Sequence, residues 1–382
     1  MTASIDTAQA DQPAPSRLER LMPLLDSDPS NLALLADVAE TAMAEQRPEV
    51  AAELLDRYAA IAPLPPRECN LAGLAALQTR RYDRAVELFG QLVDSGEDDP
   101  AVRFNLAWAC AMNKDFDRAL ELADDDLARA LPQAAMLQVQ ILHDRGEFDD
   151  AADRAREYIE IHPSYGPLMA AVSVLALDVE DPDLAAACAA KGGEHPDALA
   201  TLGTLALGEE RATEALELFD RALERNQQVP RAWVGRGLAR LLTGASPEAA
   251  ADIDRGAEMF GDHLGSWIAA GWAHFVNKDM AAARARFETA LELDANFAET
   301  HGSLAVLDLL EGDAEGARAK SEVALRLDRQ CYSAALARTL LAASAGDQAT
   351  AKRIYDAAVN APIDGSGRTI GQALAKLGMG HG

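Results

Sequence analysis

Histidine, cysteine and paired carboxylates most often carry catalysis or hold a metal ion, and this chain arranges none of them for either task. Seven histidines and four cysteines are scattered over 382 residues. No two histidines have the spacing of a helical His-Glu-x-x-His zinc pair, and no Cys-x-x-Cys occurs. A Gly-Lys-Ser/Thr phosphate loop and a Gly-x-Ser-x-Gly nucleophile turn are also missing. The sequence therefore predicts no enzyme, no catalytic residue, no metal site and no cofactor.

The charge of the chain limits its partners. The formal net charge is −27 at pH 7, and the acidic excess is concentrated in residues 1–190. Phosphate backbones need clustered Lys and Arg, so nucleic acid is not expected as a partner. Two interpretations of the acidic N-terminal half stay open. A basic protein could dock there, or the carboxylates form a solvated surface that keeps the chain soluble.

A repeat of about 34 residues runs through the chain. The segments Tyr82-Asp83-Arg84-Ala85 and Phe116-Asp117-Arg118-Ala119 show it most clearly. The alanine that ends both segments recurs in register, and we call these residues the marker alanines. They are Ala51, Ala85, Ala119, Ala151, Ala185, Ala215, Ala249, Ala283, Ala317 and Ala351.

Other residue types keep fixed distances from the marker alanines. Small residues stand twelve positions earlier, at Ala39, Gly73, Ala107, Gly203, Gly237, Gly271 and Ala305. Large apolar residues stand four positions later, at Leu55, Phe89, Phe219, Ile253, Phe287 and Tyr355. Glycines stand five positions earlier, where a turn is expected, at Gly146, Gly244, Gly312 and Gly346. The pattern predicts two closely packed helices per repeat, with the large side chain filling the space between hairpins.

This combination of small residue, turn, alanine and aromatic resembles the tetratricopeptide repeat family over about residues 32–360, with about ten repeats. The resemblance implies an all-α fold, a right-handed superhelical solenoid of antiparallel helix hairpins. One hairpin cannot bury its apolar face alone, so stacked neighbours would build a continuous core.

The irregular parts of the chain predict its boundaries. Residues 164–196 hold the poorest repeat, and they form either a joint between two arrays or an ordinary degenerate repeat. The ends hold short apolar patterns, including Ile370, Leu374 and Leu377 after the last repeat. The expected parts are a disordered tail (1–16), an N-terminal capping helix (17–30), a first array (31–163), the poor repeat (164–196), a second array (197–360), and a linker, closing helix and loose tail (361–382).

The resemblance also implies where a partner would bind. In such arrays the first helix of each hairpin lines a concave face that takes extended peptides or helices. The expected inward positions lie about fifteen, eleven and eight residues before each marker alanine. The resulting candidates are Phe104, Trp108, Met112, Val234, Leu238, Leu241, Ile268, Trp272, Phe275 and Val306.

The chemistry of these positions predicts the kind of partner. The positions eleven before each marker carry no Lys, Arg or Asn, so the grip on a C-terminal carboxylate known in some family members is not expected. An apolar peptide or an amphipathic helix would suit the face. A second interpretation stays open, in which a tightly wound array buries these side chains as core.

The sequence thus predicts a non-catalytic scaffold or adaptor that binds one or more proteins. The alternative is a dedicated chaperone or assembly factor for a secretion, pilus or envelope machine. Unpaired cysteines, an N-terminus without a basic and apolar leader, and no apolar run of about 20 residues predict a cytoplasmic protein without a membrane span. The abundance of Arg and Ala suggests a bacterial source.

The repeat register is tested by placing a charge at a marker position. Ala283→Asp would bury an unpaired carboxylate between two helices, so the free energy of unfolding should fall by about 3 kcal/mol or more. The measurement is chemical denaturation of both proteins. A change of less than about 1 kcal/mol would show that the register is wrong.

Overall fold

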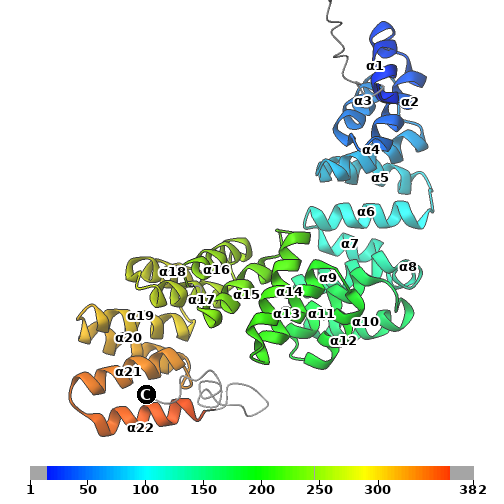
Figure 1. Ribbon diagram of the computed structural model, residues 1–382. Helices are drawn as coiled ribbons and strands as arrows, with labels where there is room; N and C mark the ends of the chain where they lie inside the picture. Colours follow the sequence, from blue (N-terminus) through cyan, green and yellow to red (C-terminus); the bar gives the residue numbers. More distant parts are fainter. Residues whose placement is uncertain (1–14, 245, 362–382) are drawn as a thin grey trace, which may run out of the picture. The chain divides into compact units, whose positions relative to one another are not determined.

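The computed structural model describes residues 15–244 and 246–361. All regular structure within these residues is helical, in 22 helices without a strand. The helices, which Figure 1 labels in chain order, divide into two compact units, one ending at Leu175 and the other beginning at Ala176. The expected all-α fold is confirmed, and each unit is described below by itself.

The first unit holds the helices α1 to α10 and most of α11. Their bounds are α1 Arg17–Ser27, α2 Leu32–Ala44, α3 Pro48–Ile61, α4 Pro66–Gln78, α5 Tyr82–Asp94, α6 Pro100–Met112, α7 Phe116–Leu122, α8 Asp125–Ala130, α9 Pro132–Asp144, α10 Phe148–Ile161 and α11 Gly166–Asp178.

The second unit holds the end of α11 and the remaining helices. Their bounds are α12 Pro182–Gly192, α13 Pro196–Gly208, α14 Ala212–Arg225, α15 Pro230–Thr243, α16 Ser246–Phe260, α17 Leu264–Val276, α18 Met280–Leu293, α19 Ala298–Leu310, α20 Ala314–Leu327, α21 Tyr332–Ser344 and α22 Gln348–Val359. Several helices begin with proline. The first helical position tolerates proline because the N–H that proline lacks would have no intrahelical partner there.

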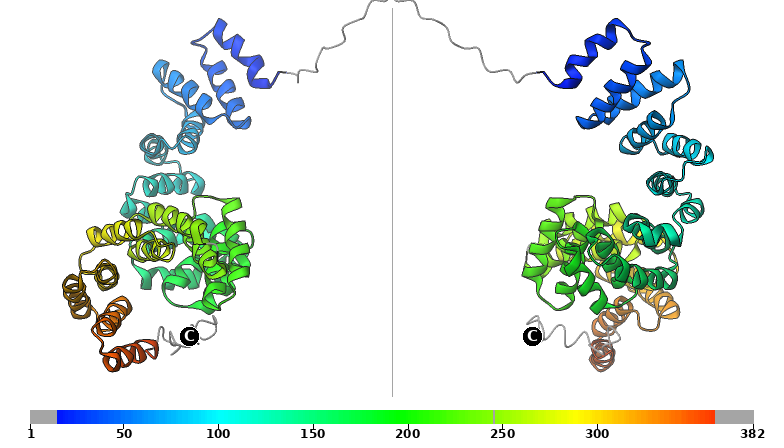
Figure 2. Two further views of the ribbon diagram at one scale, coloured as in Figure 1. Left: turned by 60° about the vertical axis from the view of Figure 1, so that its left-hand side comes forward. Right: turned by 90° about the vertical axis from the view of Figure 1, so that its right-hand side faces the viewer.

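From α2 onwards the helices pair as successive hairpins, and within each unit the hairpins stack on one another (Figure 2). The marker alanines lie on the second helix of each pair, and all ten are buried. The small residues twelve positions earlier, on the first helices, are buried as well. The predicted register of about ten repeats is therefore confirmed.

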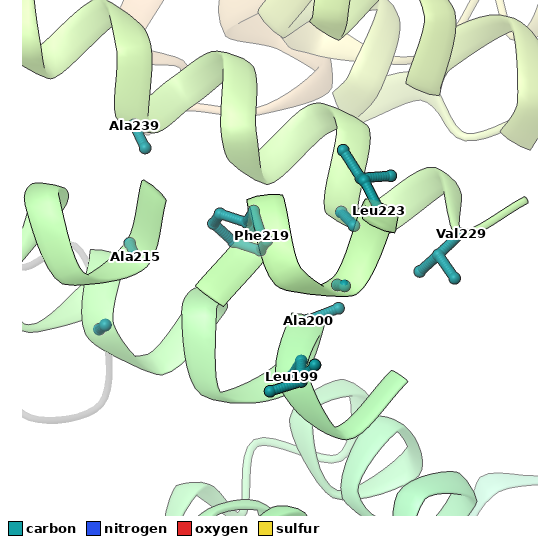
Figure 3. Packing of buried hydrophobic residues seen from close by; sticks show 10 residues of the cluster. Leu199, Ala200, Ala215, Phe219, Leu223, Val229 and Ala239 are labelled. Carbon is teal, nitrogen blue, oxygen red and sulfur yellow. The ribbon is translucent and has the colours of Figure 1, made fainter. Parts of the chain in front are cut away.

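The ring of Phe219 shows why small residues are needed at these contacts (Figure 3). A Cβ atom added to Gly203, on the first helix of the same hairpin, would lie 2.8 Å from this ring. A Cβ atom added to Gly235, on the first helix of the next hairpin, would lie 2.2 Å from it. The ring thus fills the space between two hairpins, and any larger residue at either glycine would displace it.

Tyr355 departs from this packing. The large residues four positions after the earlier markers are at most 1% exposed, whereas Tyr355 is 51% exposed. It lies on α22, the last described helix, so no further described hairpin covers it. The predicted closing helix with Ile370, Leu374 and Leu377 lies outside the described residues, as does most of the predicted N-terminal tail.

The hairpin of Ala119 has a broken second helix, which the sequence analysis did not predict. Helix α7 ends at Leu122 and α8 begins at Asp125. The Asp124 carboxylate accepts a hydrogen bond from the Leu127 N–H at 2.8 Å and one from Arg103 at 2.7 Å. Asp124 therefore caps a new helix instead of continuing the old one.

The poorest predicted repeat spans α11 and α12. Helix α12 begins at Pro182, and the boundary between the two units falls inside α11. Whether residues 164–196 act as a joint stays a prediction.

Every hairpin turn contains one residue with positive φ, five positions before the marker alanine. Four of these residues are the predicted glycines. The other six are Gln46, Arg80, Lys114, Glu180, Glu210 and Lys278, with φ between 57° and 64°. The left-handed conformation costs a residue with a side chain about 1 kcal/mol, so these six turns are strained by the fold.

Relieving this strain should stabilise the chain. Lys278→Gly should raise the free energy of unfolding by about 0.5–1 kcal/mol, because glycine adopts positive φ without steric cost. Gly312→Ala, at the matching turn of the next hairpin, should lower it by about 1 kcal/mol. Denaturant unfolding of both variants provides the measurement. A lower free energy of unfolding for Lys278→Gly, or a higher one for Gly312→Ala, would contradict the assigned turn geometry.

Candidate functional site

The candidate residues of the first unit share one helix. Phe104, Trp108 and Met112 all lie on α6, the first helix of its hairpin. The rings of Phe104 and Trp108 are half-buried, with centroids 6.2 Å apart. Met112 is 39% exposed. Helix α6 therefore presents a small apolar face that solvent partly reaches.

The candidates of the second unit lie on α15, α17 and α19. Val234, Leu238 and Leu241 on α15 are half-buried, as are Ile268, Trp272 and Phe275 on α17. Val306 on α19 is only 1% exposed. It packs with Ala305 and Ala337, and the rings of Trp272 and Phe275 lie against this cluster. A partner could not reach Val306 directly, so its part in binding would be to support those rings.

The side chain of Trp272 packs partly in the core and is partly exposed to solvent. Its ring makes edge contacts with Phe275 and with the fully buried Phe287, at centroid distances of 5.1 and 5.6 Å. Such contacts fix the orientation of an aromatic side chain. Because the ring is half-buried, part of it remains available to another molecule.

The other two tryptophans of this unit are engaged inside the array. Trp267 is buried against Ala257 and Ala290, and its Nε1 donates a hydrogen bond to the Gly261 carbonyl at 2.7 Å. Two guanidinium groups lie over the ring of Trp233, that of Arg236 at 4.5 Å from the ring centroid and that of Arg255 at 4.3 Å. These contacts distinguish both residues from Trp272.

Three strongly exposed apolar residues extend the predicted face. Leu242 is 44% exposed, Val276 is 57% exposed and Leu310 is 54% exposed. Val276 and Leu310 end α17 and α19, and Leu242 is the second-to-last residue of α15. All three stand seven positions before successive marker alanines, and we call them the apolar ladder. Met112 stands at the same position in the first unit, and this shared spacing would have identified the other three from the sequence.

Ion pairs join α17 and α19, which carry part of this face, to neighbouring second helices. The Asp254 carboxylate on α16 accepts hydrogen bonds from His274 on α17 at 2.8 Å and from Arg286 on α18 at 2.7 Å. Burial raises the pKa of Asp254, but the hydrogen bonds from Arg286 and His274 outweigh burial and hold the pKa below its usual value. Asp308 on α19 is paired in the same way with Arg284 and Lys320.

The four cysteines are all buried. Burial, followed by the nearby Glu299 carboxylate, raises the pKa of the Cys331 thiol to about 12. This thiol therefore stays protonated at neutral pH.

No helix within residues 15–244 and 246–361 is long and apolar enough to cross a membrane.

A family model and one solved structure agree with the stacked hairpins. A family model described as tetratricopeptide repeat matches residues 70–135 and 200–263. No curated protein matches the chain. Among solved structures, IFIT1 with Gppp-AAAA, in a monomeric mutant form, is similar at 10% identity and a TM-score of 0.51, over 89% of this chain and 94% of that one. The crystal structure of the APC/C hetero-tetramer Cut9–Hcn1 matches at 13% identity and a TM-score of 0.42, over 94% and 92%.

The Asp254 ion pairs predict a pH dependence. A carboxylate whose folded pKa is lowered stabilises the fold above its unfolded pKa of about 3.9, and this stabilisation is lost as the pH falls through the folded pKa. Asp254→Asn should therefore lower the free energy of unfolding at pH 7 by about 1–3 kcal/mol. The difference from the unchanged protein should shrink below about pH 4. Denaturation at several pH values measures it, and a difference independent of pH would contradict this role.

Proposed function

We propose that this chain, which matches the tetratricopeptide repeat family over residues 70–135 and 200–263, is a non-catalytic scaffold that binds another protein on the first helices of its second unit. The observation that carries the proposal is the exposure of Leu242, Val276 and Leu310 at one position of three successive hairpins. A row of exposed apolar side chains on a folded chain is typical of an interaction surface.

The shape and chemistry of this surface favour an amphipathic helix or an apolar segment. Trp272 and Phe275 would provide a rigid aromatic centre, and the apolar ladder would lie beside it. Aromatic residues of this kind carry much of the energy of protein interfaces, because they offer large apolar area for little lost freedom. Adjacent first helices would supply contacts at regular intervals along a partner helix.

A dedicated chaperone or assembly factor is the second candidate. The same exposed face that binds a partner would also shield an apolar segment of a client from aggregation. The two functions differ in what happens to the bound protein. A chaperone releases its client, whereas a scaffold keeps its partner bound. Proteins captured by the full chain and identified by mass spectrometry would separate them. The cytoplasmic location and the bacterial source stay predictions.

A basic protein on the first unit is a further proposal. A cavity of about 460 Å³ between α2 and α4 is lined by Asp37, Glu40 and Glu68. Arg17 pairs with Asp37 and Arg67 pairs with Glu40, so part of this charge is already neutralised. A basic partner would add to these pairs rather than meet bare carboxylates.

The apolar ladder can be tested with matched charge substitutions. Val276→Glu and Leu310→Glu place a carboxylate where an apolar partner would lie, and both positions are exposed, so the fold should remain. Capture of the proteins retained by the unchanged chain should fall at least tenfold, a loss of about 1.4 kcal/mol or more.

The control variants are Leu293→Glu and Leu327→Glu. These residues are similarly exposed but end the second helices α18 and α20. Capture should survive both substitutions. If all four variants lose the same proteins equally, the first helices are not the binding surface.

The two tryptophans of α17 should respond in opposite ways. Trp272→Ala should weaken binding of a captured partner by about 2 kcal/mol, with a smaller loss of stability. Trp267→Ala should lower the free energy of unfolding by about 3 kcal/mol, because it leaves a cavity between α16 and α18. Melting and partner affinity are measured side by side. If Trp272→Ala unfolds the chain as strongly as Trp267→Ala, the residue belongs to the core.

A further inference from the structure

The last described hairpin contains a cavity of about 530 Å³. It lies between the end of α20, the start of α21 and the second half of α22. Its wall is largely apolar and includes Leu325, Tyr332, Ala335, Ile354 and Ala357. A cavity of this size accommodates a small molecule or one or two side chains of a bound peptide.

Three arginines surround this cavity, namely Arg329, Arg338 and Arg353. No carboxylate is among the lining residues. None of the three guanidinium groups has an ion pair within the described part of the chain, although Arg236, Arg284 and Arg286 of the same unit are each paired with aspartate. We call this feature the arginine cavity.

Three guanidinium groups without an ion pair in the described part of the chain line one apolar cavity, although the whole chain has a net charge of −27. Like charges held close together repel, and a bound anion would remove that repulsion. Guanidinium groups also match carboxylates in geometry, since each can donate two parallel hydrogen bonds. The arginine cavity is therefore suited to a ligand that combines an apolar group with negative charge.

We propose that the arginine cavity binds an acidic segment of a partner protein. An apolar side chain of that segment enters the cavity, and neighbouring Asp or Glu residues pair with Arg329, Arg338 and Arg353. This inference rests on the proposed scaffold function and adds a second contact point, separate from the apolar ladder. Together the two sites would select partners with an acidic segment next to an amphipathic one.

The charge of the chain's own C-terminal segment argues against that segment as the occupant. Ala361 lines the cavity, and residues 362–382 follow it in the sequence. These residues contain one acidic side chain, Asp364, against Arg368 and Lys376. They cannot neutralise three arginines, whereas an acidic partner segment can.

The test measures fluorescence anisotropy of a labelled peptide, Gly-Asp-Glu-Leu-Phe-Asp-Glu-Gly, titrated with the full chain. The matched peptide carries Asn and Gln in place of Asp and Glu. The acidic peptide should bind at least tenfold more tightly than the neutral one, and added salt should weaken its binding. Equal binding of both peptides, or binding of neither, would overturn the inference.

Variants then assign the binding to this cavity. Arg338→Ser with Arg353→Ser should weaken binding of the acidic peptide at least tenfold, because two exposed cations are lost without a change in core packing. Arg318→Ser removes an exposed arginine of α20 that does not line the cavity, and it should leave the affinity within twofold. Equal effects of both changes would indicate general charge attraction and contradict a site.

Two further variants separate the remaining outcomes. Leu374→Ser should leave the affinity unchanged, and a severalfold gain would show that residues 362–382 occupy the cavity instead. Val276→Glu should also leave it unchanged, because the apolar ladder is a separate site. If no acidic peptide binds while partner capture still depends on Val276, the inference fails and the proposed function stands.

Sedimentation of the full chain tests a second copy as the occupant. Self-association that is lost with Arg353→Ser would mean that an acidic surface of another copy fills the cavity, which would contradict a partner protein as the ligand.

Discussion

The rest of this structure depends on one kind of contact, in which a large side chain on a second helix packs against small residues on two first helices. Phe219 shows it most fully, since its ring leaves no room for a Cβ atom at Gly203 or at Gly235. Because one ring touches its own hairpin and the next, each hairpin is completed only by its neighbour. A stack built in this way extends as long as the pattern of small and large residues continues, and Tyr355 is exposed where the described hairpins end.

The same stacking creates the proposed binding surface. Hairpins that repeat one contact place equivalent positions of successive first helices side by side, so an apolar residue at a single position becomes a row. Leu242, Val276 and Leu310 form such a row, and the ion pairs of Asp254 and Asp308 tie α17 and α19 to the second helices beside them. Binding on this surface would use side chains that the fold does not need. Charged substitutions there should therefore weaken partner binding while the free energy of unfolding changes little.

The fold was largely predictable from the sequence, and the site only in part. The contact around Phe219 demands particular residue types at fixed positions, so the marker alanines and glycines give the hairpins and their order. The break after Leu122 was not predictable, because it depends on Arg103 and Asp124, which lie far apart in the sequence and pair in the fold. Spacing alone also predicted that Val306 lies on the partner-binding face of the first helices, although it is buried and the rings of Trp272 and Phe275 pack against its cluster. The arginine cavity is lined by residues of three helices, and no local pattern reveals that its arginines have no ion pair within residues 15–244 and 246–361.

Hydrogen exchange of the full chain, with and without a captured protein partner, tests the central claim most directly. The account predicts slower exchange near the C-terminal ends of α15, α17 and α19, since a partner that covers Leu242, Val276 and Leu310 would also restrict opening of those helix ends. The second helices α16, α18 and α20 should change little. Protection confined to the second helices, with the first helices unchanged, would contradict binding on the first-helix face.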